Sequence, residues 1–249
     1  YITRETAELV TGEFSRVGCP VIVSPGNHDP YTHGSIWEKI KMPDNVKVFS
    51  SDVLQCFSFP ELNTDVYGYA FVSGEMTSVP LASASVADRG RINLICAHAD
   101  MTSPLSHSAP LSKDVLASFG ADYAALGHLH QHQRTQKKSE RVQYSGSLMR
   151  YSFDEVRQNK GVIVGTIGED GSVETDFREL TPLHQVRVLE GTFAELMSEE
   201  REASEDYLQV ILTDELPVID AMPKLREKYK NALGVEQNMG YKEDSGCRD

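Results

Sequence analysis

The strongest structural signal in this chain is the segment Pro20-Val21-Ile22-Val23-Ser24-Pro25-Gly26-Asn27-His28-Asp29. Its β-branched residues predict a short buried strand, and the Pro-Gly pair predicts a loop where that strand ends. Polar side chains follow the loop at once. Ligands of α/β proteins bind at the carboxyl ends of the strands, so the segment indicates both a fold class and the position of a site.

The same arrangement occurs twice more. Residues 92–97 are predicted to form a strand that ends at His98, and residues 123–126 one that ends at Gly127-His128. Incidental residues seldom produce three strands that each deliver a histidine or an asparagine at one end. We therefore expect an α/β fold with one site at these strand ends.

Further elements surround these strands. Apolar residues at helical spacing predict a helix over Thr3–Val17, with Thr3 as its N-cap. Asp170-Gly171 predicts the turn of a β-hairpin. The other predicted elements are strands at 46–49, 53–59 and 66–72, a helix at 112–119, and the hairpin strands at 161–166 and 172–175.

The pattern changes near Thr181-Pro182, and we predict a domain boundary close to Leu183. A first domain then spans residues 1–183 and a small domain spans residues 184–239. Residues 240–249 form a tail without a recognisable element. The small domain is predicted to be a βαβα unit, with strands at 185–189 and 207–213 and helices at 192–198 and 218–229.

The composition is that of a globular protein with a sizeable core: 249 residues, of which 40% are hydrophobic and 24% charged. A formal net charge of -13 excludes a protein that holds nucleic acid through a broadly basic surface. If DNA is the substrate, metal ions and local patches have to supply the attraction. One basic run is either such a patch or a solvated loop: Arg134, Lys137, Lys138, Arg141 and Arg150.

Cysteine usage and hydropathy indicate the compartment. Cys19, Cys56, Cys96 and Cys247 show no paired spacing, so we expect reduced thiols and a cytoplasmic protein. No apolar run reaches the length of a membrane span and no leader pattern opens the sequence, so no membrane association is expected. The chain starts at Tyr1, directly before a helical pattern, and we expect it to be truncated at this end.

The residue types in Gly26-Asn27-His28-Asp29 suit a metal and acid–base site. The carboxamide oxygen of Asn27 is a good ligand for a divalent ion. His28 can act as an acid or stabilise a developing oxyanion, with Asp29 as its orienting partner. The alternative is a plain turn, because Gly, Asn and Asp all favour turns.

A second cluster is Gly127-His128-Leu129-His130-Gln131-His132. In an extended segment, His128 and His130 project to one side while Leu129 packs behind them, and paired imidazoles suit Mn, Fe or Zn. The alternative is a polar loop with incidental histidines. A single histidine such as His98 is more often a satisfied core residue than a metal ligand. The two other motifs at strand ends support the interpretation of His98 as a ligand. We interpret four further histidines as ordinary, with the third of them nearest the site: His33, His107, His132 and His184.

Together, these three motifs resemble those of the calcineurin-like metallophosphoesterase superfamily. The resemblance implies an α/β fold, a four-layer αββα sandwich that holds two metal ions at the strand ends. It does not indicate the residues that bind substrate. It also implies residue roles: Asn27, His98 and His128 would bind one ion, His130 would bind the other, and His28 would be the catalytic histidine.

A narrower resemblance is to SbcD-type DNA exonuclease subunits. It rests on Gln131 after the histidine pair, on Tyr144-Ser145-Gly146-Ser147 leading to Tyr151-Ser152-Phe153, and on the tail from Leu208 to Leu225. It implies an exonuclease in which two Mn ions activate a water for attack on a DNA phosphodiester. It also implies an SbcC-type ATPase as partner in DNA repair, recombination and replication, and a small α+β domain that caps the DNA. Whether the chain forms a homodimer is left open.

The resemblance breaks at one point. The first two motifs of the superfamily, Asp-x-His and Gly-Asp-x-x-(Asp/His), do not occur in this sequence. Two-metal catalysis would lack several ligands, so we expect the chain as given to be inactive. Two alternatives stay open. The first is a small-molecule phosphodiesterase or nucleotidase of the same superfamily, and the small domain argues against it. The second is a non-catalytic scaffold, and the retained metal-binding residue types argue against it.

Overall fold

The structure is a computed structural model that describes residues 3–136 and 139–238. The predicted tail at 240–249, Cys247, Lys137 and Lys138 lie outside the described residues. The chain divides into two compact units. Unit 1 comprises residues 1–147 and 161–179, and unit 2 comprises residues 148–160 and 180–249. The boundary near Leu183 stays a prediction, and the division between the units lies a few residues earlier.

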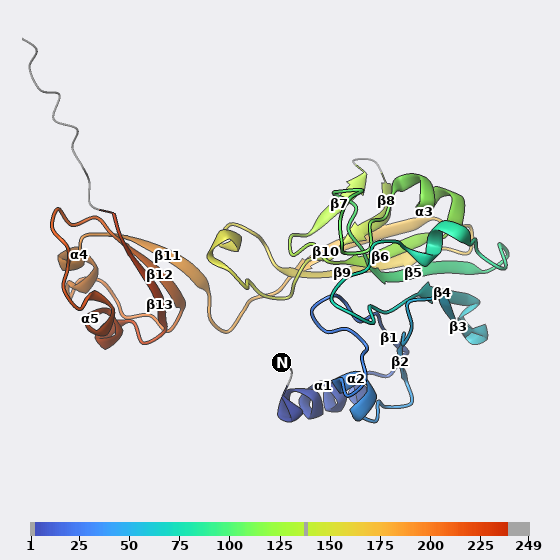
Figure 1. Ribbon diagram of the computed structural model, residues 1–249, viewed down its shortest axis with the longest axis horizontal. Helices are drawn as coiled ribbons and strands as arrows, with labels where there is room; N and C mark the ends of the chain where they lie inside the picture. Colours follow the sequence, from blue (N-terminus) through green and yellow to red (C-terminus); the bar gives the residue numbers. More distant parts are fainter. Residues whose placement is uncertain (1–2, 137–138, 239–249) are drawn as a thin grey trace, which may run out of the picture. The chain divides into compact units, whose positions relative to one another are not determined.

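Unit 1 is built on a six-stranded mixed sheet with the order β3-β4-β5-β6-β8-β7 (Figure 1). The four inner strands run parallel, and the edge strands β3 and β7 are antiparallel to their neighbours. Parallel inner strands bring their carboxyl ends to one edge of the sheet. The bounds are Gln55–Phe59 (β3), Thr64–Gly68 (β4), Ile92–His98 (β5), Tyr123–Gly127 (β6), Gln133–Gln136 (β7) and Ser139–Tyr144 (β8).

The core of unit 1 lies against this sheet. In β5, inward-facing residues alternate with half-buried ones, as expected for a strand with one face on the core. The helix α3, Lys113–Phe119, begins at Ser112, whose side chain accepts a hydrogen bond from the Val115 amide, and ends at Gly120 in the left-handed conformation. The largest core side chains that α3 and the sheet bury include Tyr69, Phe71, Ile95, Phe119 and Tyr144.

Smaller elements complete unit 1. The strands β1 (Val21–Val23) and β2 (Val46–Val48) form a parallel pair, and β9 (Gly161–Ile167) and β10 (Val173–Glu179) form the predicted hairpin. Thr3 caps α1 as predicted, but of its expected apolar face Ala7 is buried while Val10 and Val17 are exposed. The helices are α1 (Arg4–Arg16) and α2 (Ile36–Lys39), with short 3-10 turns η1 (Pro60–Leu62) and η2 (Pro80–Ser83).

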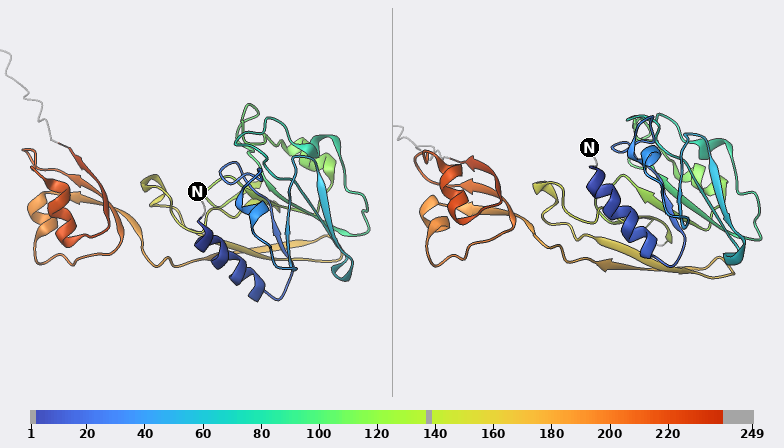
Figure 2. Two further views of the ribbon diagram at one scale, coloured as in Figure 1. Left: turned by 60° about the horizontal axis from the view of Figure 1, so that its bottom comes forward. Right: turned by 90° about the horizontal axis from the view of Figure 1, so that it is seen from below.

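Unit 2 contains a parallel three-stranded sheet, β11-β12-β13, with α4 and α5 on one face (Figure 1 and Figure 2). Thr192 and Glu195 form a reciprocal capping box at the start of α4. Leu208, Val210 and Leu225 lie in the core between the helices and the sheet. The bounds are η3 (Phe153–Glu155), β11 (Val186–Gly191), α4 (Phe193–Met197), β12 (Tyr207–Leu212), α5 (Ala221–Lys228) and β13 (Ala232–Gln237).

The structure confirms the α/β class and corrects three details. The expected βαβα unit has an additional strand, β13, which the sequence hides because Gly234 interrupts a short apolar run. The strands β7 and β8 were also not predicted, since they are polar and form by pairing with each other. The strand expected at 66–72 is β4 and ends at Gly68. Among the described residues, no helix is both long and apolar enough to cross a bilayer.

Candidate metal centre

Two of the candidate histidines meet at the ends of neighbouring strands. His98 is the last residue of β5, and its register partner on β6 is Gly127, directly before His128. The two imidazoles stand edge to face, with ring centroids 5.3 Å apart. The parallel pairing of β5 and β6 thus brings together two residues that the sequence only suggested were related.

The loop after β1 reaches the same place. The Ser24 hydroxyl donates to the Tyr69 carbonyl at 2.8 Å, and the Phe71 amide donates to the Pro25 carbonyl at 3.1 Å, which ties this loop to the segment after β4. A β-carbon at Gly26 would lie 2.6 Å from Nδ1 of His98, and one at Gly127 would lie 3.2 Å from the same atom. Both motif glycines therefore leave room for the ring of His98.

Two polar atoms at this junction are buried and lack a hydrogen-bond partner among the described residues. They are Oδ1 of Asn27 and Nε2 of His98. Buried polar atoms of native proteins are nearly always satisfied, so each such atom requires a specific reason. An amide oxygen and an imidazole nitrogen are both donors that a divalent ion accepts.

The electrostatic environment of His98 keeps its ring neutral. Burial, followed by charge interactions with His128, His28 and His130, lowers the pKa of His98 to about 4. The ring also stands edge to face with Phe71, at a centroid distance of 5.4 Å. A neutral imidazole retains the lone pair that a metal ligand needs.

His128 occupies a strained position next to a carboxylate. Its φ of 114° is unusual for a residue with a β-carbon, so the extended geometry expected for His128–His130 does not hold. Its Nε2 lies 3.6 Å from Oδ2 of Asp100. Although burial raises the pKa of Asp100, hydrogen bonds from Thr102 and Ser106 outweigh it and hold this pKa below its usual value. Sequence reasoning missed Asp100, and its place two residues after His98 was the available signal.

His130 lies in a loop that unit 1 holds in place. Leu129 packs against the core, as predicted. The Ser147 amide donates to the His130 carbonyl at 3.0 Å. Gly146, with a φ of 82°, passes so close that a β-carbon there would lie 2.8 Å from the same carbonyl. The segment after β8 thus fixes the backbone of His130.

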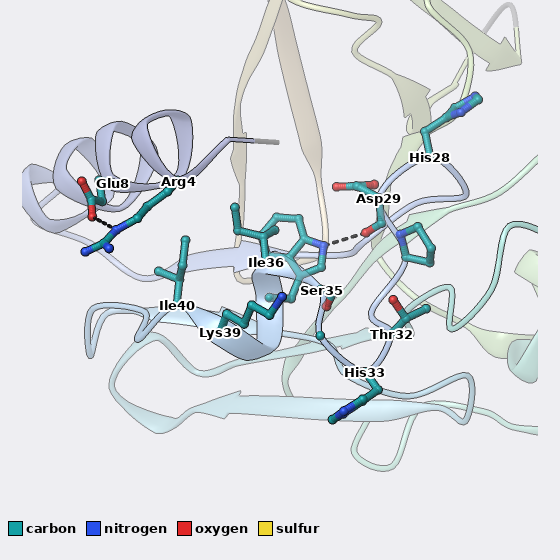
Figure 3. A pocket seen from close by; sticks show the side chains of 13 residues that line it. Arg4, Glu8, His28, Asp29, Thr32, His33, Ser35, Ile36, Lys39 and Ile40 are labelled. Carbon is teal, nitrogen blue, oxygen red and sulfur yellow. Dashed lines mark hydrogen bonds and ion pairs between the residues drawn. The ribbon is translucent and has the colours of Figure 1, made fainter. Parts of the chain in front are cut away.

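His28 and Asp29 border a pocket of about 1100 Å³ that reaches α1 and α2. Figure 3 shows the imidazole of His28 and the carboxylate of Asp29 pointing in different directions. Oδ1 of Asp29 accepts from the Gly26 amide at 2.9 Å, and Nε1 of Trp37 donates to the Asp29 carbonyl at 2.6 Å. Burial raises the pKa of Asp29. Asp29 therefore shapes the turn, and its orienting role towards His28 stays a prediction.

The remaining histidines have contacts of their own. His132, expected to be the nearest of them, stacks on Phe177 at 4.3 Å and its Nδ1 lies 3.0 Å from the Tyr144 carbonyl. His33 pairs with Glu38 and His107 with Glu75, both at the surface. The ring of His184 stands against Tyr207. These contacts agree with our interpretation of the four as ordinary residues.

Two arginines of the basic run, Arg141 and Arg150, donate hydrogen bonds within their own units. The Arg141 guanidinium donates to the carbonyls of Asp122 and Gly171 in unit 1. The Arg150 guanidinium donates to the Gln158 carbonyl and to the side chain of Gln185 in unit 2. These two arginines hold loops together, which favours the structural alternative for them.

The donor chemistry fits a divalent metal ion, although the number of ligands is small. One amide oxygen and three imidazoles are ligands that Mn, Fe or Zn accept. In the described part of the chain, however, no three His, Cys, Asp or Glu side chains form by themselves a group that could hold an ion. The residues present could thus supply only part of a coordination shell, as expected for a sequence without the two carboxylate motifs.

Comparisons with known proteins agree with this picture. The family model described as calcineurin-like phosphoesterase matches residues 1–132, more than half of the chain. A second, described as type 5 capsule protein repressor C-terminal domain, matches residues 182–246. A protein of Staphylococcus epidermidis, named as the SbcD component of the nuclease SbcCD, is 26% identical over 261 aligned residues, which cover 94% of this chain and 68% of that protein.

Proposed function

This chain belongs to the calcineurin-like phosphoesterase family, and from that premise we propose that it is part of a metal-dependent DNA exonuclease. The proposed protein is the nuclease component of an SbcCD-like complex. Its substrate is DNA and its partner is an SbcC-type ATPase. The similarity along 94% of the chain to a relative named as a component of the nuclease SbcCD supports this choice within the family.

One observation carries the proposal: Oδ1 of Asn27 and Nε2 of His98 are buried without a hydrogen-bond partner among the described residues. A purely structural role would leave both atoms at a cost of about 1–3 kcal/mol each. Ligation of a divalent ion removes that cost. We assign Asn27, His98 and His128 to one ion and His130 to the other, and we propose manganese for both.

The ions, when bound, lower the pKa of a water and neutralise charge on the phosphate. The residues of the chain supply the rest. His98 holds its donor atom in a fixed position, since Gly26 and Gly127 pack on its ring. His28 is exposed at the mouth of the pocket, so its imidazolium can donate a proton to the leaving oxygen or stabilise charge on the phosphate.

A net charge of -13 is compatible with a DNA substrate under this proposal. Bound ions contribute positive charge where the phosphodiester binds, so the protein does not require a broadly basic surface. It follows that binding of DNA by the metal-free protein should be weak. We also propose that unit 2, most of which matches a C-terminal family model, caps the DNA.

The test measures Mn²⁺-dependent release of nucleotides from linear duplex DNA by the full-length protein, alone and with an SbcC-type ATPase. We expect release in the presence of Mn²⁺, its loss on chelation, and a loss of at least about 100-fold in His28→Gln, as is typical of a general acid. His33→Gln, at an exposed histidine paired with Glu38, is the matched control and should retain activity.

Two other outcomes would decide between the alternatives. Hydrolysis of small phosphodiesters without release from DNA would refute the exonuclease and favour a small-molecule phosphodiesterase or nucleotidase. A full-length protein that binds no divalent ion in calorimetry and hydrolyses neither substrate would refute the metal site and favour a non-catalytic scaffold.

A further inference from the structure

We propose that Asp100 is a positioning residue, whose carboxylate faces Nε2 of His128 and so makes Nδ1 the metal-binding nitrogen. The inference rests on the proposed metal site, but its first step concerns the metal-free protein. Outer carboxylates that accept the second N–H of a metal-binding histidine fix both the tautomer and the orientation of the ring.

The carboxylate of Asp100 is held rigidly. Its Oδ1 accepts two hydrogen bonds from Thr102, from the amide at 2.7 Å and from the hydroxyl at 2.6 Å. Its backbone amide lies 3.0 Å from the Ser108 carbonyl, and its carbonyl accepts from the Leu111 amide at 2.8 Å. The Ser106 side chain makes a further hydrogen bond to this carboxylate, and Oδ2 is the oxygen that faces Nε2 of His128.

The contact with His128 is electrostatic in this structure. Oδ2 of Asp100 lies 3.6 Å from Nε2 of His128, which is longer than a hydrogen bond. A neutral imidazole carries its proton on one nitrogen and a lone pair on the other. A lone pair facing a carboxylate is repelled, whereas an N–H is attracted, so the proton stays on Nε2. The lone pair is then on Nδ1.

His98 shows the opposite arrangement. Its Nε2 is the buried atom without a hydrogen-bond partner among the described residues, and its Nδ1 lies against Gly26. The two rings, with centroids 5.3 Å apart, therefore offer different nitrogens to a shared ion. The φ of 114° at His128 is a strained backbone conformation that turns this ring relative to an extended chain. Asp100 then selects the nitrogen.

The first measurement is the tautomer of His128 in full-length, metal-free protein labelled with ¹⁵N-histidine and observed by NMR. We expect the Nε2–H form in the natural protein. Asp100→Ala should give a mixture of tautomers. Asp100→Asn keeps the size of the side chain and removes its charge, and it should give a smaller change in the same direction. Thr102→Ala, which removes one bond to Oδ1, carries the test if the Asp100 variants do not fold.

The matched control is Asp65→Asn. Asp65 is as buried as Asp100, at 6% exposure, and it binds Ser58 and Arg91 in the body of the sheet. This variant should lose stability and keep the tautomer of His128. The second measurement is Mn²⁺ affinity by calorimetry, which we expect to fall by about 10- to 100-fold in Asp100→Ala and to stay unchanged in Asp65→Asn.

The outcomes separate the two proposals. An Nδ1–H or doubly protonated His128 in the natural protein, or a tautomer that folded Asp100 variants leave unchanged, would overturn the role of Asp100. If the tautomer depends on Asp100 but the natural protein binds no Mn²⁺, the positioning role stands and the proposed function fails.

Discussion

The imidazole of His98 packs directly on Gly26, where an added β-carbon would lie 2.6 Å from Nδ1. We expect Gly26→Ala to displace the ring, to lower the free energy of unfolding by about 1–3 kcal/mol and to weaken Mn²⁺ binding. Gly127→Ala, with 3.2 Å to the same atom, should have a smaller effect. Gly12→Ala is the control, since nothing lies within 4 Å of its added carbon. Equal effects at all three glycines would contradict the packing argument.

The lowered pKa of His98 predicts that the free energy of unfolding depends on pH. Burial, with the neighbouring histidines, lowers its pKa to about 4, whereas the unfolded chain titrates near pH 6.5. Below pH 6.5 the folded state therefore binds fewer protons at His98 than the unfolded chain does. The contribution of His98 to the free energy of unfolding is fully present above pH 6.5 and is lost as the pH falls towards 4. Its size is on the order of 3 kcal/mol. NMR titration of His98 and urea unfolding of metal-free protein check this, and titration of His98 near pH 6.5 would disprove it.

The hydroxyl of Tyr144 supports the loop after β5. It donates to the Ala99 carbonyl at 2.8 Å and accepts from the Met101 amide at 3.0 Å. Tyr144→Phe leaves both backbone groups without this partner, so we expect a loss of about 1–3 kcal/mol in urea unfolding. Tyr207→Phe, at a residue that is 39% exposed, should cost much less. If Tyr144→Phe left the free energy of unfolding unchanged, water or a loop shift would have to satisfy both backbone groups.

His132 should be structural. Its ring stacks on Phe177 with centroids 4.3 Å apart. We expect His132→Ala to lower the unfolding free energy by about 1 kcal/mol and His132→Phe, which keeps an aromatic stack, to restore part of it. Mn²⁺ affinity, measured by calorimetry, should be the same in both variants as in the natural protein. A large loss of affinity in His132→Phe would instead make His132 part of the site.

A buried ion pair in unit 2 joins Glu155 to Lys160 at 2.8 Å, and Oε2 of Glu155 also accepts from the Tyr151 amide. Removing one partner leaves a buried charge, so Lys160→Met or Glu155→Leu alone should cost about 3–5 kcal/mol. The double variant should cost less than the sum of the two. A double-mutant cycle in urea tests this, and additive effects would show that the pair is not coupled.

The elements that the sequence predicted well are those whose cause is local. Thr3 and Ser112 cap α1 and α3 through their own side chains, and Asp170-Gly171 turns the hairpin of β9 and β10. The strand β13 was missed because it is stabilised by pairing with β12 and not by the propensity of its own residues. Propensity in a single segment cannot report a pairing with another segment.

The same distinction applies to the candidate site. The amino-acid sequence by itself determined the chemistry, namely an asparagine and three histidines at the ends of strands, because residue type and strand end are local properties. The tertiary structure decided how they act. Gly26 appeared as a turn glycine and proves to make room for His98, and Asp100 lies beside His128 only because β5 pairs with β6. Contacts between distant segments depend on sheet pairing and packing, which no single stretch of sequence contains.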